Sequence, residues 1–183
     1  VIIHALNCNV QNLRMKLVDG FRPNFESLPL IFYCKSLKSL YLPALKSLHL
    51  GWVQFTASGN DSAEPFSNCY VLNTFVLEYC SLPNDAQFLC ISNSSLSSLT
   101  ILGGQPYQFV LSSPNVSSFS TMGSINHQLF STCNLSFLGE VSVDVKLDLG
   151  KHENTSMIMK WLQVLANAKI LQFCPGALRT MLD

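Results

Sequence analysis

The sequence predicts an α/β solenoid, with one parallel β-sheet on one face and irregular loops and helices on the other. Three observations predict this fold class. A short apolar pattern, φxxLxL with φ apolar, recurs eight times along the 183 residues. Its copies follow one another at a nearly constant interval, and leucine accounts for 29 residues. Internal repetition of this kind is typical of repeat proteins, whose units stack into one continuous core.

The spacing of the copies narrows the fold class to a leucine-rich-repeat solenoid. Successive central residues are 27, 8, 27, 24, 20, 22 and 30 residues apart, and most of these steps lie near the roughly 20–29 residues of a leucine-rich repeat. The central residues are, in order, Leu13, Leu40, Leu48, Phe75, Leu99, Phe119, Val141 and Leu171. We therefore expect one leucine-rich-repeat domain over residues 1–183, a horseshoe with its parallel sheet on the concave face.

Each copy also predicts which side chains face the core. The two residues of an LxL pair lie two apart, so on a strand they point to the same side. The residue between them points outward, and the outward residues of stacked strands form one continuous surface. That surface is the default protein-binding face of such a solenoid. Its candidate binding residues are Tyr41, His49, Val76, Thr100, Ser120 and Ser142, in one row with Arg14 and Gln172.

One step in the series is too short for the fold, and it creates an irregular junction over residues 37–50. The copies at residues 37–42 and 45–50 are separated only by Pro43 and Ala44. A crossover between parallel strands needs about a dozen residues, and proline lacks the N–H that a central strand requires. We expect residues 37–42 to be forced out of the regular ladder while residues 45–50 keep their place. The expected consequence is a poorly packed N-terminal part with exposed leucines.

Near the C-terminus the spacing predicts a helix. Asn154 or Thr155 can cap it. An apolar stripe at helical spacing follows, which makes its tryptophan a core residue rather than a ligand platform. The stripe consists of Ile158, Trp161, Leu162 and Leu165.

Composition and motifs exclude several function classes. Charged residues make up 12% of the chain, and residues 47–145 contain six acids but neither Lys nor Arg. A nucleic-acid surface needs clustered basic residues, so we expect no nucleic-acid partner. No apolar run approaches the ~18 residues of a membrane helix. The motifs GxSxG, GxGxxG and HExxH and the P-loop are absent, so we expect no enzyme activity, cofactor or metal.

The seven cysteines favour a reducing compartment. The closest pair is ten residues apart, which matches neither zinc-finger nor redox spacing. Several lie in apolar stretches, where buried thiols act as small hydrophobic side chains. Glycosylation sequons point the other way, because they carry meaning in a secreted protein. There are five, at Asn60, Asn93, Asn115, Asn134 and Asn154.

Several segments resemble, in the family's own order, the repeat region of plant F-box proteins with leucine-rich repeats, of the RNI-like, FBD-associated type. LPLIFYCKSL at residues 28–37 resembles the LPxxLFxCxSLxxLxL block, and LPALKSLHL at residues 42–50 resembles the LPxLKxLxL block. FSNCYVL at residues 66–72 is similar to the start of FxxCxxLxxLxLxxC, and residues 89–101 are similar to LxISxxxLxxLTI. SPNV at residues 113–116 and LANAKIL at residues 165–171 are similar to (S/T)PNL and LANVKxL.

The resemblance implies a solenoid that recognises a protein target in the cytoplasm or nucleus. In that family an F-box recruits the adaptor of a cullin-RING ubiquitin ligase, and the repeats select the substrate. We expect no F-box before Val1 and no further domain after Asp183, so adaptor binding maps to no residue here. The expected function is substrate recognition by such an F-box protein. An extracellular leucine-rich-repeat ectodomain that binds a ligand stays open as the alternative, and no motif supports a third reading as a serine hydrolase.

Overall fold

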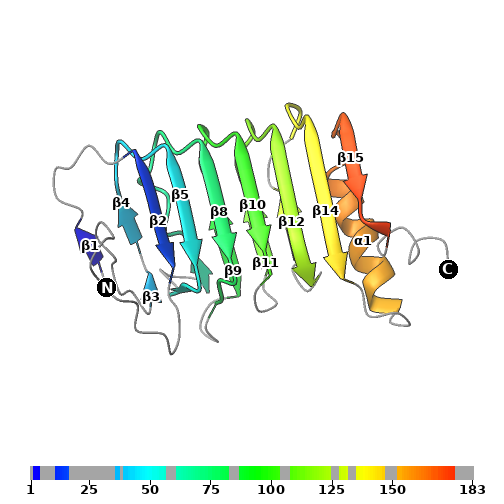
Figure 1. Ribbon diagram of the computed structural model, residues 1–183, viewed down its shortest axis with the longest axis horizontal. Coiled ribbons are helices and arrows are strands. Elements are labelled where there is room, and N and C mark those ends of the chain that lie inside the picture. The colour runs from blue at the N-terminus through cyan, green and yellow to red at the C-terminus, as the bar shows by residue number, and fades with distance from the viewer. Residues whose placement is uncertain are drawn as a thin grey trace.

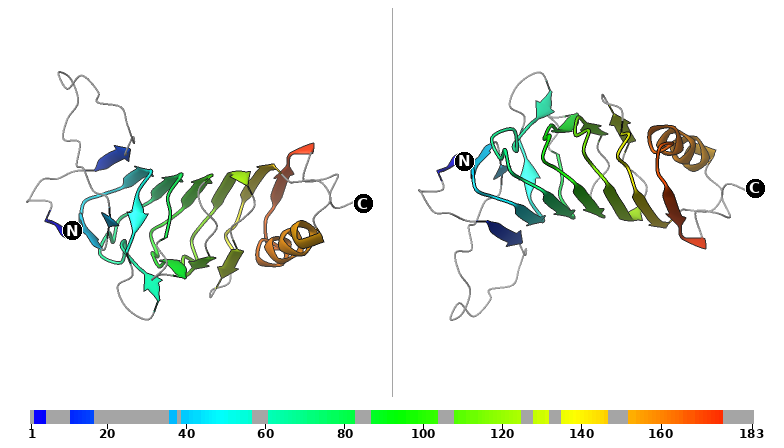
Figure 2. Two further views of the ribbon diagram at one scale, coloured as in Figure 1. Left: turned by 90° about the horizontal axis from the view of Figure 1, so that it is seen from below. Right: turned by 90° about the horizontal axis from the view of Figure 1, so that it is seen from above.

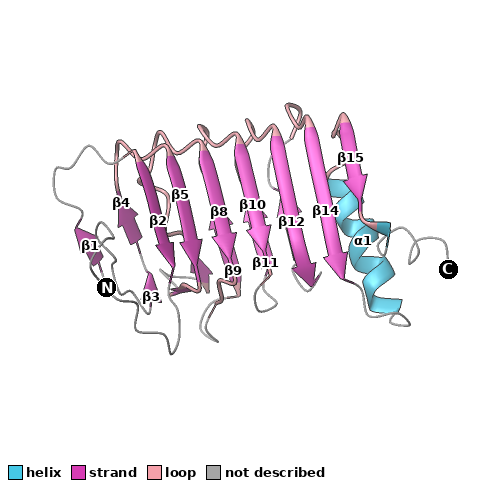
Figure 3. Ribbon diagram, viewed as in Figure 1, coloured by secondary structure: helices cyan, strands magenta, loops and turns pink. Residues whose placement is uncertain are grey.

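The computed structural model shows a stack of parallel β-coils that runs along the chain (Figure 1). It describes residues 2–4, 11–16, 36–37, 39–56, 61–82, 87–103, 108–124, 128–131, 135–146 and 152–175. The described part is built mainly of strands and contains one helix, α1 (His152–Val164) (Figure 3).

Seven parallel strands form the larger sheet, and they follow one another in chain order. They are β2 (Asn12–Lys16), β5 (Ser47–Gly51), β8 (Thr74–Glu78), β10 (Ser98–Leu102), β12 (Ser118–Ser124), β14 (Glu140–Lys146) and β15 (Ile170–Phe173). The strands stand in an almost straight row (Figures 1 and 2), so this stack shows little of the curvature expected for a horseshoe.

A second parallel sheet covers the opposite side of the stack (Figure 2). Its strands are β7 (Ser62–Ala63), β9 (Phe88–Ile91), β11 (Gln108–Leu111) and β13 (Gln128–Ser131). In the described part of the chain, the expected loops and helices on this face are therefore corrected to strands, and a helix is present only in the last coil. The reason is local: β9 and β11 alternate partly exposed and buried residues, as a strand does when one of its faces lies on a core.

The predicted apolar ladder is confirmed in register. Equivalent positions in β5, β8, β10, β12 and β14 hold the central residues of the repeats, which gives coils of 27, 24, 20 and 22 residues. In each of these five strands, the two residues at the L positions of the LxL pair are at most 5% exposed. In β15 Leu171 keeps the register but is 38% exposed, because this strand is the last of the sheet. The structure thus defines a parallel β-solenoid.

Aromatic side chains fill the space between the two sheets. The Phe66 ring packs against Phe75 at a centroid distance of 4.3 Å and against Phe55 at 5.6 Å. At the C-terminal end, the ring of Trp161 in α1 lies 5.7 Å from that of Phe119 and is 2% exposed. This placement confirms Trp161 as a core residue.

The coils are joined at the start of each strand by a repeated hydrogen-bond pattern. Two consecutive backbone N–H groups donate to one carbonyl of the preceding coil. Ser97 and Ser98 bind the Asn73 carbonyl at 2.9 and 3.0 Å, and Ser117 and Ser118 bind the Ser97 carbonyl at 2.9 and 3.0 Å. The same pair of hydrogen bonds recurs at the start of each larger-sheet strand from β5 to β14, and it sets the register between neighbouring coils.

The strand pairing at the irregular junction over residues 37–50 agrees with the prediction that the first copy leaves the larger sheet. β4 (Ser39–Tyr41) pairs with β1 (Ile2–His4), and β3 (Ser36–Leu37) pairs with β6 (Gln54–Phe55). Neither joins the seven-stranded sheet, in which β5 lies beside β2. This confirms that the copy at residues 37–42 leaves the ladder.

The expected exposure of leucines at the junction is wrong. Leu40 is fully buried and Leu42 is 4% exposed. The Leu40 N–H donates to the Pro65 carbonyl at 2.8 Å, and the Leu40 carbonyl accepts a hydrogen bond from the Cys69 thiol at 3.6 Å. The displaced copy therefore serves as the return segment that leads into β5, and it packs against the equivalent return segment of the next coil.

Leu77→Asp and Thr100→Asp test the assignment of faces. Leu77 is 1% exposed, and an unpaired charge at a buried site should lower the free energy of unfolding by roughly 3–5 kcal/mol. Thr100 lies one strand away and points outward, so its substitution should change stability little. Chemical denaturation of the two variants measures both effects. Equal losses would contradict the assignment.

Candidate protein-binding face

The outward residues of the larger sheet form one row across seven strands. Register pairing places Arg14, His49, Val76, Thr100, Ser120, Ser142 and Gln172 at equivalent positions. Five of the six predicted binding residues therefore lie side by side. Tyr41 does not: its backbone lies in β4 opposite His4, because the short link before β5 leaves no room for another strand. The Tyr41 side chain lies outside the described residues.

Small hydroxyl side chains dominate this face. Ser and Thr occupy most outward positions of β8, β10 and β12, and the remaining ones hold Val76, Glu78, Leu102 and Met122. Each hydroxyl can donate and accept a hydrogen bond. Since the side chains are short, the face offers a shallow polar surface that suits another protein better than a small molecule.

A hydrogen bond links the first two regular coils across this face. The Nε2 atom of His49 lies 3.0 Å from the Oε2 atom of Glu78, and the two side chains are 22% and 14% exposed. His49 stands opposite Val76 in the register, so Glu78 is its diagonal neighbour, which is the usual reach of a cross-strand contact. Sequence reasoning selected His49 but missed its partner.

β5, β8 and β10 are each followed by a backbone position with positive φ, and the equivalent position of the next coil, Gly123, lies within β12. Trp52, Tyr79, Gly103 and Gly123 have φ values of 60°, 50°, 57° and 118°. The first three donate their N–H groups to a carbonyl of the following coil at 2.7 to 2.8 Å. Glycine adopts this conformation freely, whereas other residues lose about 1–2 kcal/mol there. Two coils thus carry large aromatic residues where the next two carry glycine.

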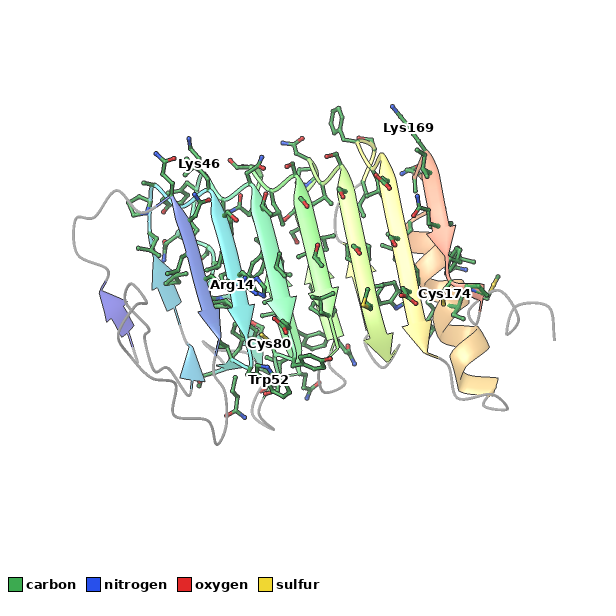
Figure 4. All side chains as sticks on the ribbon, in the orientation of Figure 1. Arg14, Lys46, Trp52, Cys80, Lys169 and Cys174 are labelled. Carbon is green, nitrogen blue, oxygen red and sulfur yellow. The ribbon has the colours of Figure 1, made fainter. Side chains whose placement is uncertain are left out.

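The rings of Trp52 and Tyr79, the residues that follow β5 and β8, stack on each other. We call this place the aromatic corner; Trp52 is labelled there in Figure 4. Their ring centroids are 4.6 Å apart with an interplanar angle of 19°, and Trp52 and Tyr79 are 50% and 47% exposed. The Tyr79 ring also covers Gly103, where an added Cβ would lie 2.5 Å from the Tyr79 Cε1 atom. Sequence reasoning missed this pair, although both residues stand two positions after an LxL pair.

Several buried polar groups among the described residues form hydrogen bonds between neighbouring coils. The Cys80 thiol donates to the Leu50 carbonyl at 3.5 Å, and burial raises its pKa to about 11. A thiol with a raised pKa is a poor nucleophile. The described residues hold no cluster of three or more His, Cys, Asp or Glu suited to a metal ion.

Asn93, one of the five sequon asparagines, belongs to this buried set. It is 8% exposed, and its Nδ2 group donates to the Cys69 carbonyl at 2.7 Å. Its N–H donates to Ser113 Oγ at 3.1 Å, and that hydroxyl donates to the Ile91 carbonyl at 3.0 Å. The amide nitrogen that a glycan would occupy is therefore already engaged in the folded chain.

No protein-family model, curated protein or solved structure matches the chain. Its class rests on the fold itself, a parallel β-solenoid of short coils with two parallel sheets. The helix in the described part of the chain is too short and too polar to cross a bilayer.

Gly103→Ala tests the strained corner. The added methyl would sit at positive φ and collide with the Tyr79 ring, so the free energy of unfolding should fall by about 1–2 kcal/mol or more. In a Tyr79→Gly background the steric part disappears and the loss should shrink. Thermal unfolding of the four proteins in this cycle measures the coupling. Additive effects would show that the ring does not press on the glycine.

Proposed function

We propose that the chain is a protein-interaction module, the substrate-recognition region of an F-box protein that acts in a cullin-RING ubiquitin ligase. The observation that carries this proposal is the continuous outward row on the larger sheet. Six strand spacings of about 4.8 Å give it a length of about 29 Å, enough to contact an extended segment or a protein surface. The row is polar, shallow and made of neighbouring strands, as a recognition face requires.

The F-box assignment is supported by the sequence blocks that resemble this family. Residues 72–80 follow the LxxLxLxxC pattern, and its two central positions, Phe75 and Leu77, are buried in the ladder. The closing position, Cys80, binds the preceding coil through its thiol. The role of the ligase as a whole would depend on an F-box elsewhere in the parent protein.

The alternative is an extracellular ectodomain, which the five sequons favour. Two observations weigh against it. The sequon residue Asn93 is buried and hydrogen-bonded. The four cysteines among the described residues form no disulfide bond; they are Cys69, Cys80, Cys90 and Cys174. Free thiols are characteristic of reducing compartments.

A pair of matched variants tests the recognition face. Val76 points outward from β8 in the larger sheet, and Val110 points outward from β11 in the opposite sheet; both are partly exposed. Captured proteins are compared by quantitative mass spectrometry with the parent protein as bait. Val76→Asp should reduce capture of the target about tenfold, as expected for a central contact, while Val110→Asp should not. Equal capture by both variants would move the binding site off this face.

Thiol titration separates the two cellular settings. Protein isolated from its native host is denatured and its free thiols are counted against the seven cysteines of the sequence. The intracellular proposal predicts seven free thiols and no attached glycan. Missing thiols that return on reduction, or a mass shift removed by a glycosidase, would favour the extracellular alternative.

A further inference from the structure

The outer edge of β15 pairs with no strand in the described part of the chain. β15 stands at the end of the row of seven strands (Figure 1), and β14 pairs with it on one side. The N–H groups of Ile170 and Cys174 face β14 and donate to backbone carbonyls there. Because backbone groups alternate between the two sides of a strand, the N–H and C=O groups of Leu171 and Phe173 point to the outer edge. A further strand would bind to these groups.

The same edge exposes the apolar column that the inner strands bury. In β5, β8, β10, β12 and β14 the central residue of the repeat is at most 1% exposed, whereas Leu171 at this position of β15 is 38% exposed. Phe173 continues the second inward column and is only partly buried. An added strand with apolar residues at two alternate positions would cover both side chains on the outer side, as β14 does on the inner side.

The first and last strands of this sheet differ in the features that prevent strand pairing. Exposed edge strands are commonly protected by charged residues or by proline. The first strand, β2, holds Arg14 and Lys16 among its five residues. The four residues of β15, Ile-Leu-Gln-Phe, include neither a charged residue nor a proline. The composition of β15 is therefore that of an inner strand, although it lies at an edge.

We propose that the outer edge of β15 receives an extended strand from a partner protein, in parallel orientation and with apolar residues at two alternate positions. The repeat specifies this occupant, because all six strand pairs of the sheet are parallel and bring the same two inward positions together. Main-chain hydrogen bonds would provide affinity, and the two apolar positions would provide selectivity. The edge is distinct from the outward row, so this inference goes beyond the proposed function and does not depend on it.

A strand of the chain itself is a suitable probe, because it already pairs with edges of this kind. The peptide LSSLTILG, residues 96–103, contains β10. In the folded chain the Ser98 N–H donates to the coil before it, and the Gly103 N–H donates to the coil after it. By alternation, the N–H of Thr100 faces the preceding strand and the N–H of Ile101 faces the following one. On β15, only the Thr100 side of the peptide would meet the protein.

Binding of this peptide, labelled with fluorescein, to the whole 183-residue chain is measured by fluorescence anisotropy. The unmodified peptide should bind. Methylation of the Thr100 nitrogen removes a donor and places a methyl group between the strands, so binding should weaken by about tenfold or more. Methylation of the Ile101 nitrogen should leave binding unchanged. These changes leave the protein unaltered, so their result does not depend on the folding of a variant.

Protein variants locate the contact. Leu171→Asp places a charge where the added strand would lie, and it should abolish peptide binding. Because Leu171 is partly exposed in the free chain, circular dichroism should show an unchanged fold. Thr100→Asp, in the middle of the outward row, is the matched control and should bind the peptide as the original chain does.

Three results would overturn the inference. The unmodified peptide would not bind if the chain's own residues 176–183 cover the edge. Equal binding of the two methylated peptides would show that the contact does not use the backbone of β15. A dimer in light scattering that Leu171→Asp dissociates would assign the edge to a second copy of the chain. These results leave the Val76→Asp comparison unaffected, so failure here is distinguishable from failure of the proposed function.

Discussion

The structure depends on one repeated interaction, the sharing of a single backbone carbonyl by two consecutive N–H groups of the next coil. It recurs at the Gln11, Lys46, Asn73, Ser97 and Ser117 carbonyls. Because the contact lies at the start of each strand, it fixes which residue stands opposite which. A slip of one residue would turn every side chain of a strand to the wrong face. Both the buried ladder and the outward row therefore follow from this contact.

The same constraint explains how the solenoid tolerates coils of unequal length. The coils differ in length, at 27, 24, 20 and 22 residues, whereas the turn before each strand keeps the same hydrogen bond. Equivalent turns close at Leu45, Leu72, Leu96, Val116 and Leu138, whose N–H groups bind the carbonyl three residues earlier. The side chain at the first turn position can change from Cys69 to Asn93 to Ser113 because each one donates to the preceding coil.

The sequence predicted the features that depend on local periodicity and chain length. The LxL pairs marked the buried columns because alternate residues of a strand share a face, and the link at Pro43 was too short for a crossover. Other features depend on long-range register. Four-residue runs such as residues 88–91 do not distinguish a strand from a loop by pattern alone. The His49–Glu78 contact joins residues that are 29 positions apart. Glu78 can be identified as the partner of His49 only when the length of the coil between them is known. Leu40 was expected to be exposed because its new neighbours lie in the next coil.

The positive-φ positions of Trp52 and Tyr79 make the outward face of the larger sheet uneven. Positive φ leaves no trace in hydropathy, so Trp52 and Tyr79 looked like ordinary residues after a strand. Their N–H groups donate to carbonyls of the next coil at 2.8 and 2.7 Å, which holds the backbone in this conformation. Stacking of the two rings stabilises the folded state by about 0.5–1.5 kcal/mol and so offsets part of the cost of the positive φ angles. Where this position holds glycine, at Gly103 and Gly123, the outward residues directly before it are Leu102 and Met122. Large outward side chains thus lie near the ends of β5, β8, β10 and β12, while Ser and Thr occupy most of the outward positions nearer the strand starts.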